Sequence, residues 1–397
     1  TTLALIELVD SVRRLLDEGN YVLGIFIDFT KAFDTVDHDI LLYKLDNYGI
    51  RGHANDFLRS YLTNRTQYTV INGHHSTPKK ISYGVPQGSV LGPLLFLIYI
   101  NDLYRSVSER ILRLFADDTS LFNHDRNLTK LVTKAKESFR DIFNWCVSNK
   151  LTINGDKTCF ILFHARNKPI PLNFKELHIE ELGITLKRVK SHSYLGLILD
   201  ENLNWHDHVD FVCRSLVKYF GIFNRIKHFV SRKISRQLYF AFVYSRIQYG
   251  IEVYGNASKY YLSKIQTMQN KLLKLLLRLD YRTSTDDLHS QLQILKVRDI
   301  FEVNILNFVN NCLMGNCPLY FESYFTLYDP RYNFRRVGDL HIDRTRTNIG
   351  SSAINILGAS LWNNIDVSLH EFKKRKCFKK SLIKSYLNNY RQLILDR

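Results

Sequence analysis

The chain has 397 residues, of which 45% are hydrophobic and 13% aromatic, so it can form the cores of two or three domains. These proportions exclude an intrinsically disordered or a collagen-like protein. Lys and Arg outnumber Asp and Glu by 55 to 38, and this surplus of 17 positive charges favours an anionic partner such as a phosphate backbone, although a basic protein without such a partner would have the same composition.

Neither a membrane span nor a secretory leader is predicted. The longest strongly apolar run, residues 90–100, contains a glycine and a proline and has eleven residues, whereas a membrane helix needs about 20. Six cysteines in 397 residues are too sparse for a disulfide scaffold, which predicts a reducing compartment. Cys312 and Cys317 have no second Cys or His pair at zinc-site spacing nearby, so we interpret them as buried thiols rather than metal ligands.

The first predicted elements are a helix and a buried strand. Apolar residues recur at helical spacing over residues 2–16, and Gly19-Asn20 ends the helix. The continuous apolar run at 21–27 is typical of a strand that is buried on both faces. This strand would place Asp28 where the chain leaves the sheet.

A turn and a helix are predicted next. Asn72-Gly73 is a turn signal between two potential strands at 67–71 and 79–83, which predicts a hairpin or paired strands before Gly84. The apolar run 90–100 predicts a buried helix. The glycine-rich segment 84–89 lies just before it.

The next segments alternate between strand and helix character. Residues 111–116 and 119–122 read as two strands joined by a tight turn that contains Asp117 and Asp118. A helix at 128–146 and a strand at 151–163 follow. The first 200 residues therefore predict an α+β fold in which helices pack on a sheet.

The chain is predominantly helical after Trp205. An apolar stripe runs from Val209 to Ile226, with basic residues beside it. Residues 205–250 contain 8 basic and 2 acidic residues, and residues 331–397 contain 14 and 5, so this part holds most of the positive charge. The basic residues beside the stripe are Arg214, Lys218, Arg225 and Lys227.

Three acidic residues occur at the ends of predicted strands. Asp28 follows one predicted strand, and Asp117-Asp118 follows another. If these two strands are neighbours in the sheet, the three carboxylates meet at one edge of it and repel one another unless cations are present. Mg²⁺ is commonly bound by one or two carboxylates together with substrate phosphates. Two such ions could activate a 3′-hydroxyl and stabilise a leaving pyrophosphate, which is nucleotidyl transfer. Taken alone, Asp117-Asp118 could equally be an ordinary hairpin turn.

The segment between these acids supports a nucleotide site. The turn at 84–89 lets a backbone approach a ligand closely, and the Gln87 side chain can hydrogen-bond to a base or a sugar. Phe33 lies five residues after Asp28, so its ring could exclude a 2′-hydroxyl, although core packing is the default interpretation of a phenylalanine there.

Five motifs resemble those of reverse transcriptases from non-LTR retrotransposons, the LINE-like, jockey-type family. Residues 27–38 (IDFTKAFDTVDH) resemble motif A, and residues 84–93 (GVPQGSVLGP) resemble motif B. The sequence FADD at 115–118 is similar to motif C, and residues 149–158 (NKLTINGDKT) are similar to motif D. Tyr194-Leu195-Gly196 resembles the primer-grip motif E. Their order and spacing also agree with the family over about residues 20–210.

The resemblance implies a right-hand polymerase: an antiparallel palm sheet with packed helices, then a helical thumb and a helical extension. The corresponding ranges are 1–204 for the palm with partial fingers, 205–285 for the thumb and 286–397 for a basic, mainly helical extension. Only about 27 residues precede Asp28, so the fingers are expected to be largely missing, and no endonuclease domain is recognised.

The resemblance also assigns roles to individual residues. Asp28, Asp117 and Asp118 would bind two Mg²⁺ ions, with Mn²⁺ as an alternative, and the Phe29 carbonyl could add a ligand. Phe33 would be the steric gate that selects deoxynucleotides, and Gln87 with Gly88 would line the nascent base pair. Lys157 would protonate the leaving pyrophosphate, although a solvated lysine is the alternative. Asp34 and His38 fit the pattern too, and structural roles such as capping the following helix are expected for them. Tyr194, Leu195, Gly196, Arg214, Lys218 and Arg225 would contact nucleic acid.

The implied partners are an RNA template, a DNA primer or target and deoxynucleoside triphosphates, without a membrane and with protein partners unknown. Cytoplasm and nucleus are the expected locations. The basic cluster at 373–376 could bind RNA, act as a nuclear-import signal or be a plain surface run. Two alternatives remain open: a catalytically inactive remnant that binds nucleic acid, and a relative such as a group II intron maturase or a telomerase-like polymerase.

Overall fold

The computed structural model describes residues 1–107, 111–280, 282–328, 338–366, 369 and 375–395. Residues 20–190 form one compact unit, and residues 1–19 together with 191–397 form the other. The first unit has a sheet covered by helices and the second is mainly helical, so the α+β class is confirmed.

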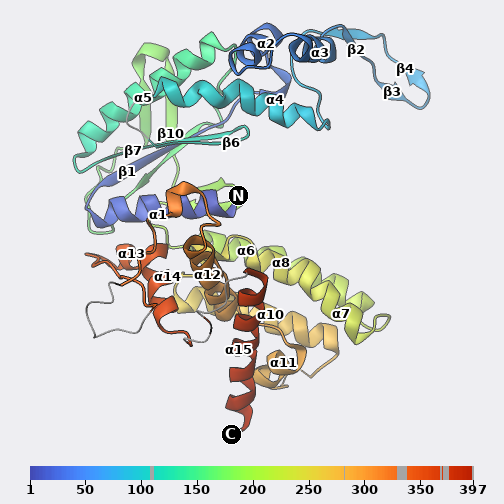
Figure 1. Ribbon diagram of the computed structural model, residues 1–397, viewed down its shortest axis with the longest axis vertical. Helices are drawn as coiled ribbons and strands as arrows, with labels where there is room; N and C mark the ends of the chain where they lie inside the picture. Colours follow the sequence, from blue (N-terminus) through green and yellow to red (C-terminus); the bar gives the residue numbers. More distant parts are fainter. Residues whose placement is uncertain (108–110, 281, 329–337, 367–368, 370–374, 396–397) are drawn as a thin grey trace. The chain divides into compact units, whose positions relative to one another are not determined.

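The unit at 20–190 is built on a six-stranded sheet with the order β6-β7-β1-β8-β10-β9 (Figure 1). Four of the five pairings are antiparallel, and β8 with β10 is parallel, so the predicted antiparallel sheet is wrong at this one pairing. The strands are β1 (Tyr21–Ile27), β6 (Ile111–Phe115), β7 (Asp118–Asp125), β8 (Cys159–Phe163), β9 (Glu176–Ile179) and β10 (Ile184–Arg188).

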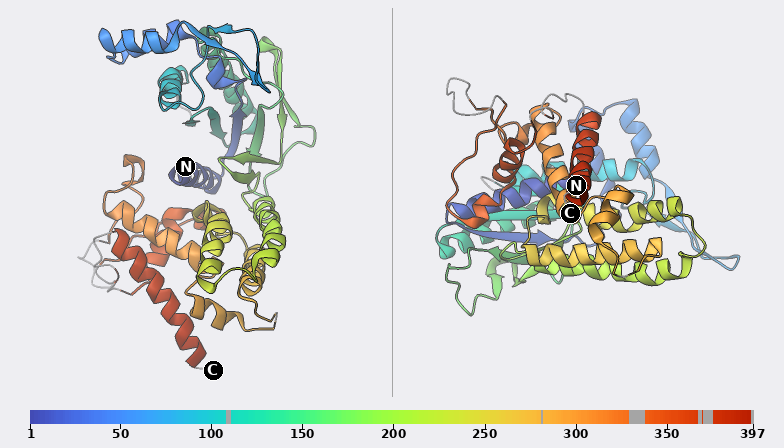
Figure 2. Two further views of the ribbon diagram at one scale, coloured as in Figure 1. Left: turned by 90° about the vertical axis from the view of Figure 1, so that its right-hand side faces the viewer. Right: turned by 90° about the horizontal axis from the view of Figure 1, so that it is seen from below.

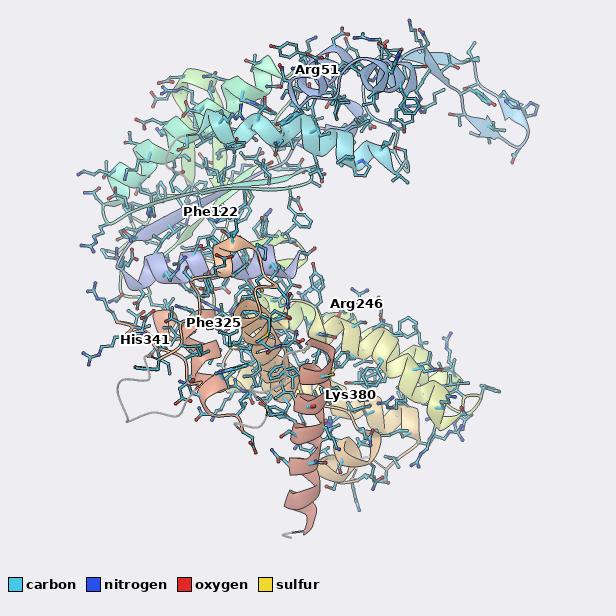
Figure 3. The ribbon with its side chains drawn as sticks, in the orientation of Figure 1. Arg51, Phe122, Arg246, Phe325, His341 and Lys380 are labelled. Atoms are coloured by element: carbon cyan, nitrogen blue, oxygen red, sulfur yellow. The ribbon has the colours of Figure 1, made fainter. Side chains whose placement is uncertain are left out.

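Strand β1 lies inside the sheet, between β7 and β8, and every one of its residues is buried, as predicted. Gly24 is required there because a Cβ would lie 2.6 Å from the ring of Phe122 on β7. The Phe122 ring, labelled in Figure 3, packs edge-on against Phe26 with 5.9 Å between the ring centroids. The strand before Asp28 is therefore held on both sides.

Helices α4 and α5 lie on the same side of this sheet (Figure 1). Helix α5 (Leu128–Ser148) packs on β7 and β1. Helix α4 (Leu91–Ile100) buries only the face with Phe96 and Tyr99, whereas Leu94 and Leu97 are 52% and 46% exposed, so the prediction of a buried helix is correct for one face only. The unit also contains η1 (Ala32–Asp34), α2 (His38–Asn47), α3 (His53–Leu62) and η2 (Asn101–Ser106).

A two-stranded arm projects after α3. Its stem pairs β2 (Arg65–Gln67) with β5 (Lys79–Ile81), and its tip pairs β3 (Val70–Ile71) with β4 (His74–His75). The predicted turn at Asn72-Gly73 is confirmed, but it joins β3 to β4 instead of joining the two longer strands expected from the sequence.

The second unit combines the first helix with the C-terminal half of the chain. Helix α1 (Thr2–Asp17) follows the predicted bounds closely. A hairpin of β11 (Ser191–Tyr194) and β12 (Leu197–Asp200) precedes the helices. These are α6 (His206–Ile226), α7 (Arg232–Leu238), the π-helix η4 (Tyr239–Tyr244), α8 (Ser245–Gln248), α9 (Ile251–Tyr254), α10 (Lys259–Leu277), α11 (Thr285–Leu292), α12 (Val297–Leu313), η5 (Leu319–Phe321), α13 (Asn348–Ser351), α14 (Ile354–Asn363) and α15 (Arg375–Leu395).

Polar side chains of α1 hold the ends of two short helices. Asp17 accepts hydrogen bonds from the Thr347 backbone N–H and hydroxyl at 2.7 and 2.6 Å. Asp10 accepts one from the Ile354 N–H at 2.6 Å. Arg13 donates to the Ser352 carbonyl at 2.9 Å, and burial lowers its pKa to about 10. The bonds from Asp17 and Asp10 satisfy N–H groups at the N-termini of α13 and α14, and the Arg13 bond satisfies a carbonyl at the C-terminal end of α13.

The apolar stripe predicted for α6 is largely confirmed, because Val209, Val212, Leu216 and Phe223 are buried. None of the helices in the described ranges is both long enough and apolar enough to cross a membrane.

Candidate active site

The three acidic residues predicted to meet lie on neighbouring strands. Ile27 of β1 is opposite Thr119 of β7, so Asp28 and Asp118 are the next residues of an antiparallel pair. Asp118 is the first residue of β7 and pairs with Phe115, and the turn consists of Ala116, at φ +54°, and Asp117. The prediction that both acids occupy the turn is therefore wrong for Asp118, which the sheet register draws into the strand.

The electrostatics of Asp118 confirm this proximity. Asp118 is exposed, yet partial desolvation raises the pKa of its carboxyl, and the carboxylates of Asp117 and Asp28 raise it further. A cation would relieve this repulsion. Among the described residues the carboxylates do not close into a ready-made cluster of three metal ligands. The donor set nevertheless fits Mg²⁺, which takes one or two carboxylates and completes its shell with water and substrate phosphates.

The predicted strand at 151–163 begins only at Cys159, and the residues before it form a loop beside Asp28. The Asn154 N–H donates to the Asp28 carbonyl at 2.8 Å, and the Asp28 N–H donates to the Thr158 hydroxyl at 3.3 Å. Lys157 therefore lies close to the acids, with its Nζ 3.8 Å from the Asp28 Oδ2. Both side chains are substantially exposed, so this ion pair adds little stability and leaves the ammonium free to move.

The two phenylalanines that follow Asp28 differ in their surroundings. Phe29 is buried and forms a β-bridge with Ile153. Phe33 is half-buried, and its ring lies 4.5 Å from that of Phe96 at an angle of 32°. Packing on Phe96 fixes the orientation of the Phe33 ring.

The loop that begins at Gly84 is bound to the segment that follows Asp28. The Gly84 N–H donates to the Val36 carbonyl, and the Val85 N–H donates to the Phe33 carbonyl, both at 2.8 Å. Gly84 has φ +86°, and a Cβ on it would lie 2.8 Å from the Asp34 backbone. Gly88, at φ +80°, faces open space. Only glycine fits the close approach at Gly84.

The Gln87 side chain reaches across this loop. Its Nε2 donates to the Asp34 Oδ1 at 2.8 Å. Both residues line a cavity of about 520 Å³, which also involves the stem of the arm. Asp34 therefore positions Gln87, a structural role of the kind expected for it, but it does not cap a helix.

The cap of α2 is Asp37, which the sequence analysis did not single out. Its Oδ1 accepts from the N–H groups of Asp39 and Ile40, and its Oδ2 lies 2.7 Å from the Lys150 Nζ. Burial raises the pKa of Asp37, but the hydrogen bonds from Lys150 and from these N–H groups outweigh burial and hold this pKa below its ordinary value. An Asp directly before a helical segment was the available signal. His38, expected as a cap, instead bonds to the Gly84 carbonyl through Nε2 at 2.8 Å.

The residues expected to contact nucleic acid belong to the second unit. Leu195 and Gly196, at φ +46° and +80°, form the turn of the β11–β12 hairpin, and the Leu195 carbonyl accepts from the Tyr249 hydroxyl at 2.6 Å. Tyr194 is buried. The side chains of Arg214, Lys218 and Arg225 are exposed on α6.

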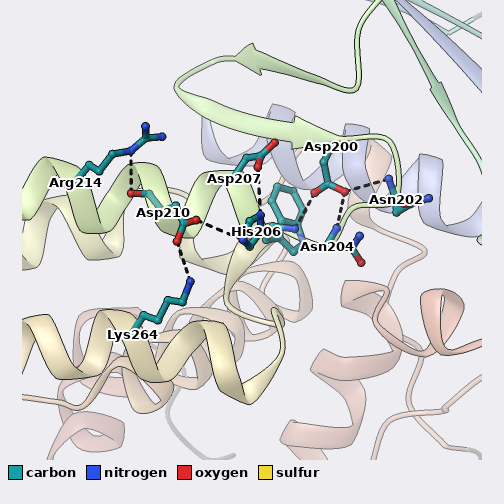
Figure 4. A network of polar contacts seen from close by, with 9 residues as sticks. Asp200, Asn202, Asn204, His206, Asp207, Asp210, Arg214 and Lys264 are labelled. Carbon is teal, nitrogen blue, oxygen red and sulfur yellow. Dashed lines mark hydrogen bonds and ion pairs between the residues drawn. The ribbon is translucent and has the colours of Figure 1, made fainter.

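Figure 4 shows how the first turns of α6 are held. Asp200 accepts from the Asn202, Asn204 and Trp205 N–H groups, and Asp210 pairs with Lys264 of α10 at 3.1 Å. Arg214 donates to the Asp210 carbonyl at 3.4 Å and points away from Lys264. Of the cluster at 373–376, residues 373 and 374 and the side chains of 375 and 376 lie outside the described residues.

Comparison with known families gives a match that includes the segments of the three acids. The family described as "Reverse transcriptase (RNA-dependent DNA polymerase)" matches residues 4–199. This range includes β1, the loop at Gly84, the turn at Asp117 and the loop with Lys157.

Several curated proteins are similar over a longer stretch. The RNA-directed DNA polymerase from mobile element jockey of Drosophila melanogaster is 26% identical over 303 residues, which are 74% of this chain and 32% of that protein. The probable RNA-directed DNA polymerase from transposon BS of the same fly is 28% identical over 313 residues, 74% of this chain and 33% of that protein. The chain thus spans about a third of the length of these relatives.

Among solved structures, the telomerase from Candida albicans in complex with a TWJ fragment of telomeric RNA aligns with 74% of this chain and 51% of its own, at 13% identity and a TM-score of 0.36. So loose a superposition carries no part of the assignment. The family match and the curated relatives do: residues 4–199 match the reverse transcriptase family, and the chain is similar to the RNA-directed DNA polymerases of non-LTR retrotransposons.

Proposed function

We propose that the chain is the RNA-directed DNA polymerase core of a non-LTR retrotransposon and copies an RNA template into DNA from deoxynucleoside triphosphates. The observation that supports the proposal is that Asp28 and Asp118 are the next residues after the Ile27–Thr119 pair of β1 and β7, with Asp117 in the adjoining turn, in a segment that matches the reverse transcriptase family. Palm, thumb and extension at 1–204, 205–285 and 286–397 are the proposed functional parts, and the cytoplasm and nucleus are the proposed locations.

Asp28, Asp117 and Asp118 would hold two Mg²⁺ ions, which Mn²⁺ could replace, and the Phe29 carbonyl could add a ligand. These ions would supply the charge that activates a primer 3′-hydroxyl and neutralises the leaving pyrophosphate. The raised pKa of Asp118 supports this assignment, because carboxylates that repel one another in the free protein gain most from bound cations.

The neighbouring side chains have distinct proposed tasks. Phe33, oriented by Phe96, would lie against the sugar and select deoxynucleotides. Gln87 and Gly88 would line the nascent base pair. Lys157, whose ammonium lies near Asp28 without being buried, would donate a proton to pyrophosphate as it leaves.

Phosphate contacts are proposed for the second unit. Arg214, Lys218 and Arg225 would bind the template and primer backbones, and the hairpin turn at 194–196 would support the primer end. Such contacts give affinity without sequence preference.

The test is incorporation of deoxynucleotides on a primed RNA template with Mg²⁺, comparing the wild type with Asp117→Asn. The variant should lose extension by at least about 1,000-fold and bind the primed template with nearly unchanged affinity, because it removes a metal ligand and no phosphate contact. Asp117 is exposed in a turn, so the substitution should leave the fold intact.

Two results would contradict the proposal. If the variant lost template binding and extension equally, Asp117 would not be a metal ligand. The wild type could bind primed RNA tightly but extend no primer. If a version extended to the full length of its relatives also bound RNA without extending primers, the chain would be the catalytically inactive nucleic-acid-binding remnant.

A further inference from the structure

The arm between α3 and the Gly84 loop has no core of its own. Every residue from 66 to 80 is exposed, including Tyr68 at 52% and Ile71 at 68%. An isolated two-stranded ribbon is at best marginally stable, so exposed apolar groups on such a ribbon are costly unless a partner covers them. Figures 1 and 2 show the arm projecting from α3.

The partner that fits the arm is an anion. Residues 57–101 contain no Asp or Glu, whereas 38 acids in 397 residues would give about four in a stretch of 45. The same stretch contains four basic residues, of which Arg65, Lys79 and Lys80 lie on the stem. No carboxylate within the arm neutralises them.

The strand pairing separates these cations onto two faces. Arg65 is opposite Ile81 and Gln67 is opposite Lys79, so these four residues share one face, while Lys80 and Thr66 share the other. Arg65, Gln67 and Ile81 line the cavity of about 520 Å³ that contains Gln87. Asp34 is the one acid that lines this cavity, and it is engaged by Gln87. The face with Arg65 and Lys79 therefore continues outward from the Gln87 side chain.

We propose that this face of the arm binds the sugar–phosphate backbone of the nucleic-acid strand held beside Gln87, an inference that rests on the proposed polymerase function. The Arg65 guanidinium can bind a phosphate through two N–H groups, and Lys79 acts as a point charge further along the ribbon. Tyr68 at the end of the stem exposes a ring on which a base can stack. The arm thereby extends the surface that binds the nucleic-acid strand.

Adjacent lysines on opposite faces provide a matched test. Lys79→Gln and Lys80→Gln remove the same charge from neighbouring, exposed positions, and neither should alter folding. Affinity of the full chain would be measured in EDTA, without nucleotides, for single-stranded RNA and for a primed RNA duplex at several salt concentrations. Lys79→Gln should weaken binding about fivefold and reduce the salt slope by about one, and Lys80→Gln should change affinity less than twofold.

Arg65→Gln should resemble Lys79→Gln, and the loss should be the same for every RNA sequence because phosphates are the ligand. A larger loss with single-stranded RNA would identify the unpaired template as the bound strand, and a larger loss with the duplex would identify the paired region. Equal effects of Lys79→Gln and Lys80→Gln, or none, would overturn the proposal, and so would binding by the arm to anionic vesicles in place of RNA.

This measurement is independent of catalysis. If the wild type extends no primer, the proposed polymerase fails while the difference between the two lysines still tests the arm. If the wild type extends primers and the two lysine variants bind alike, the polymerase stands and the arm proposal fails.

Discussion

Asp118 is a residue whose proposed role in binding metal ions is expected to lower the stability of the fold. Its pKa is raised by partial desolvation and by the carboxylates of Asp117 and Asp28. A raised pKa for an acid means that the folded state binds the proton more tightly than the unfolded chain does. Above this pKa we therefore expect the ionised carboxylate to destabilise the fold, by a small amount because Asp118 is exposed and solvent screens the repulsion, and we expect the destabilisation to disappear as the pH falls through the pKa.

We expect Asp118→Asn to raise the midpoint of thermal unfolding at pH 7 and to abolish Mg²⁺-dependent extension. The gain in stability should shrink as the pH falls into the range in which wild-type Asp118 becomes protonated, because the two side chains are then both neutral. Thermal unfolding between pH 4 and 8, with and without Mg²⁺, measures this. A variant that is less stable than the wild type at pH 7 would show that the neighbouring carboxylates do not repel.

The sequence was most informative about residues whose roles depend on local chain features. Asp28 could be placed because a fully apolar strand precedes it, and its meeting with Asp118 because the motifs implied neighbouring strands. The pairing of Asp37 with Lys150 was not predicted, because an ion pair between residues 113 apart leaves no local pattern. The roles of Phe33 and Lys157 remain predictions.

At the scale of elements, the loop from Gly84 to Gly88 contains two glycines with positive φ but different surroundings. A Cβ on Gly84 would collide with the Asp34 backbone, and a Cβ on Gly88 would meet no atom within 4 Å. A substitution by alanine would therefore introduce backbone strain at both positions, but a steric clash at Gly84 only.

Gly84→Ala should destabilise the protein by at least about 2 kcal/mol, because strain and a backbone clash add. Gly88→Ala should cost about 1 kcal/mol, since only the strained φ remains. Urea unfolding of the two variants gives this comparison. Equal losses would mean that the Asp34 segment moves to make room for the new methyl group.

The bounds of helices and strands were predicted better than which of their faces are buried. The bounds of α1, β1 and α5 follow from apolar periodicity alone, which depends on the residues themselves. The run 90–100 was taken as fully buried because all its sides are apolar, yet one face of α4 is exposed. Residues 151–158 were likewise expected to be part of a strand but form a loop. The Asn154 N–H donates to the Asp28 carbonyl and the Thr152 carbonyl accepts from the Thr30 N–H, and these bonds between distant residues leave no local pattern.

For the whole molecule, charge is the property with the widest consequence. The surplus of 17 positive charges predicts association with nucleic acid that depends steeply on salt. Exposed Arg214, Lys218 and Arg225 on α6 are the proposed contacts.

If these three residues each bind one phosphate, they contribute about −2.7 to the slope of log affinity against log salt, or roughly a fortyfold loss between 50 and 200 mM. Replacing all three by Gln should remove this part of the slope for any RNA sequence. Replacing Lys130, Lys175 and Lys190, which are also exposed, provides a control with the same charge change. Equal slopes for the two triple variants would show that net charge alone drives binding.

The compact units of the structure do not follow the functional parts predicted from the motifs, which stay a prediction. The boundaries expected from the motifs are at 204 and 285, whereas the compact units separate after residues 19 and 190. Helix α1 looked like the start of the sheet domain because it directly precedes β1. Its membership of the other unit depends on Asp10, Arg13 and Asp17, whose partners are more than 200 residues away in the sequence.

This arrangement has a consequence for synthesis on the ribosome. Asp17 and Thr347 are 330 residues apart, and translation at about 5–20 residues per second separates their emergence by roughly 15 to 65 s. During that interval α1 has been made, but the helices whose N-termini it satisfies have not. The sheet of residues 20–190 can form in the meantime, whereas the unit that contains α1 can be completed only after the helices that follow Thr347 have been made.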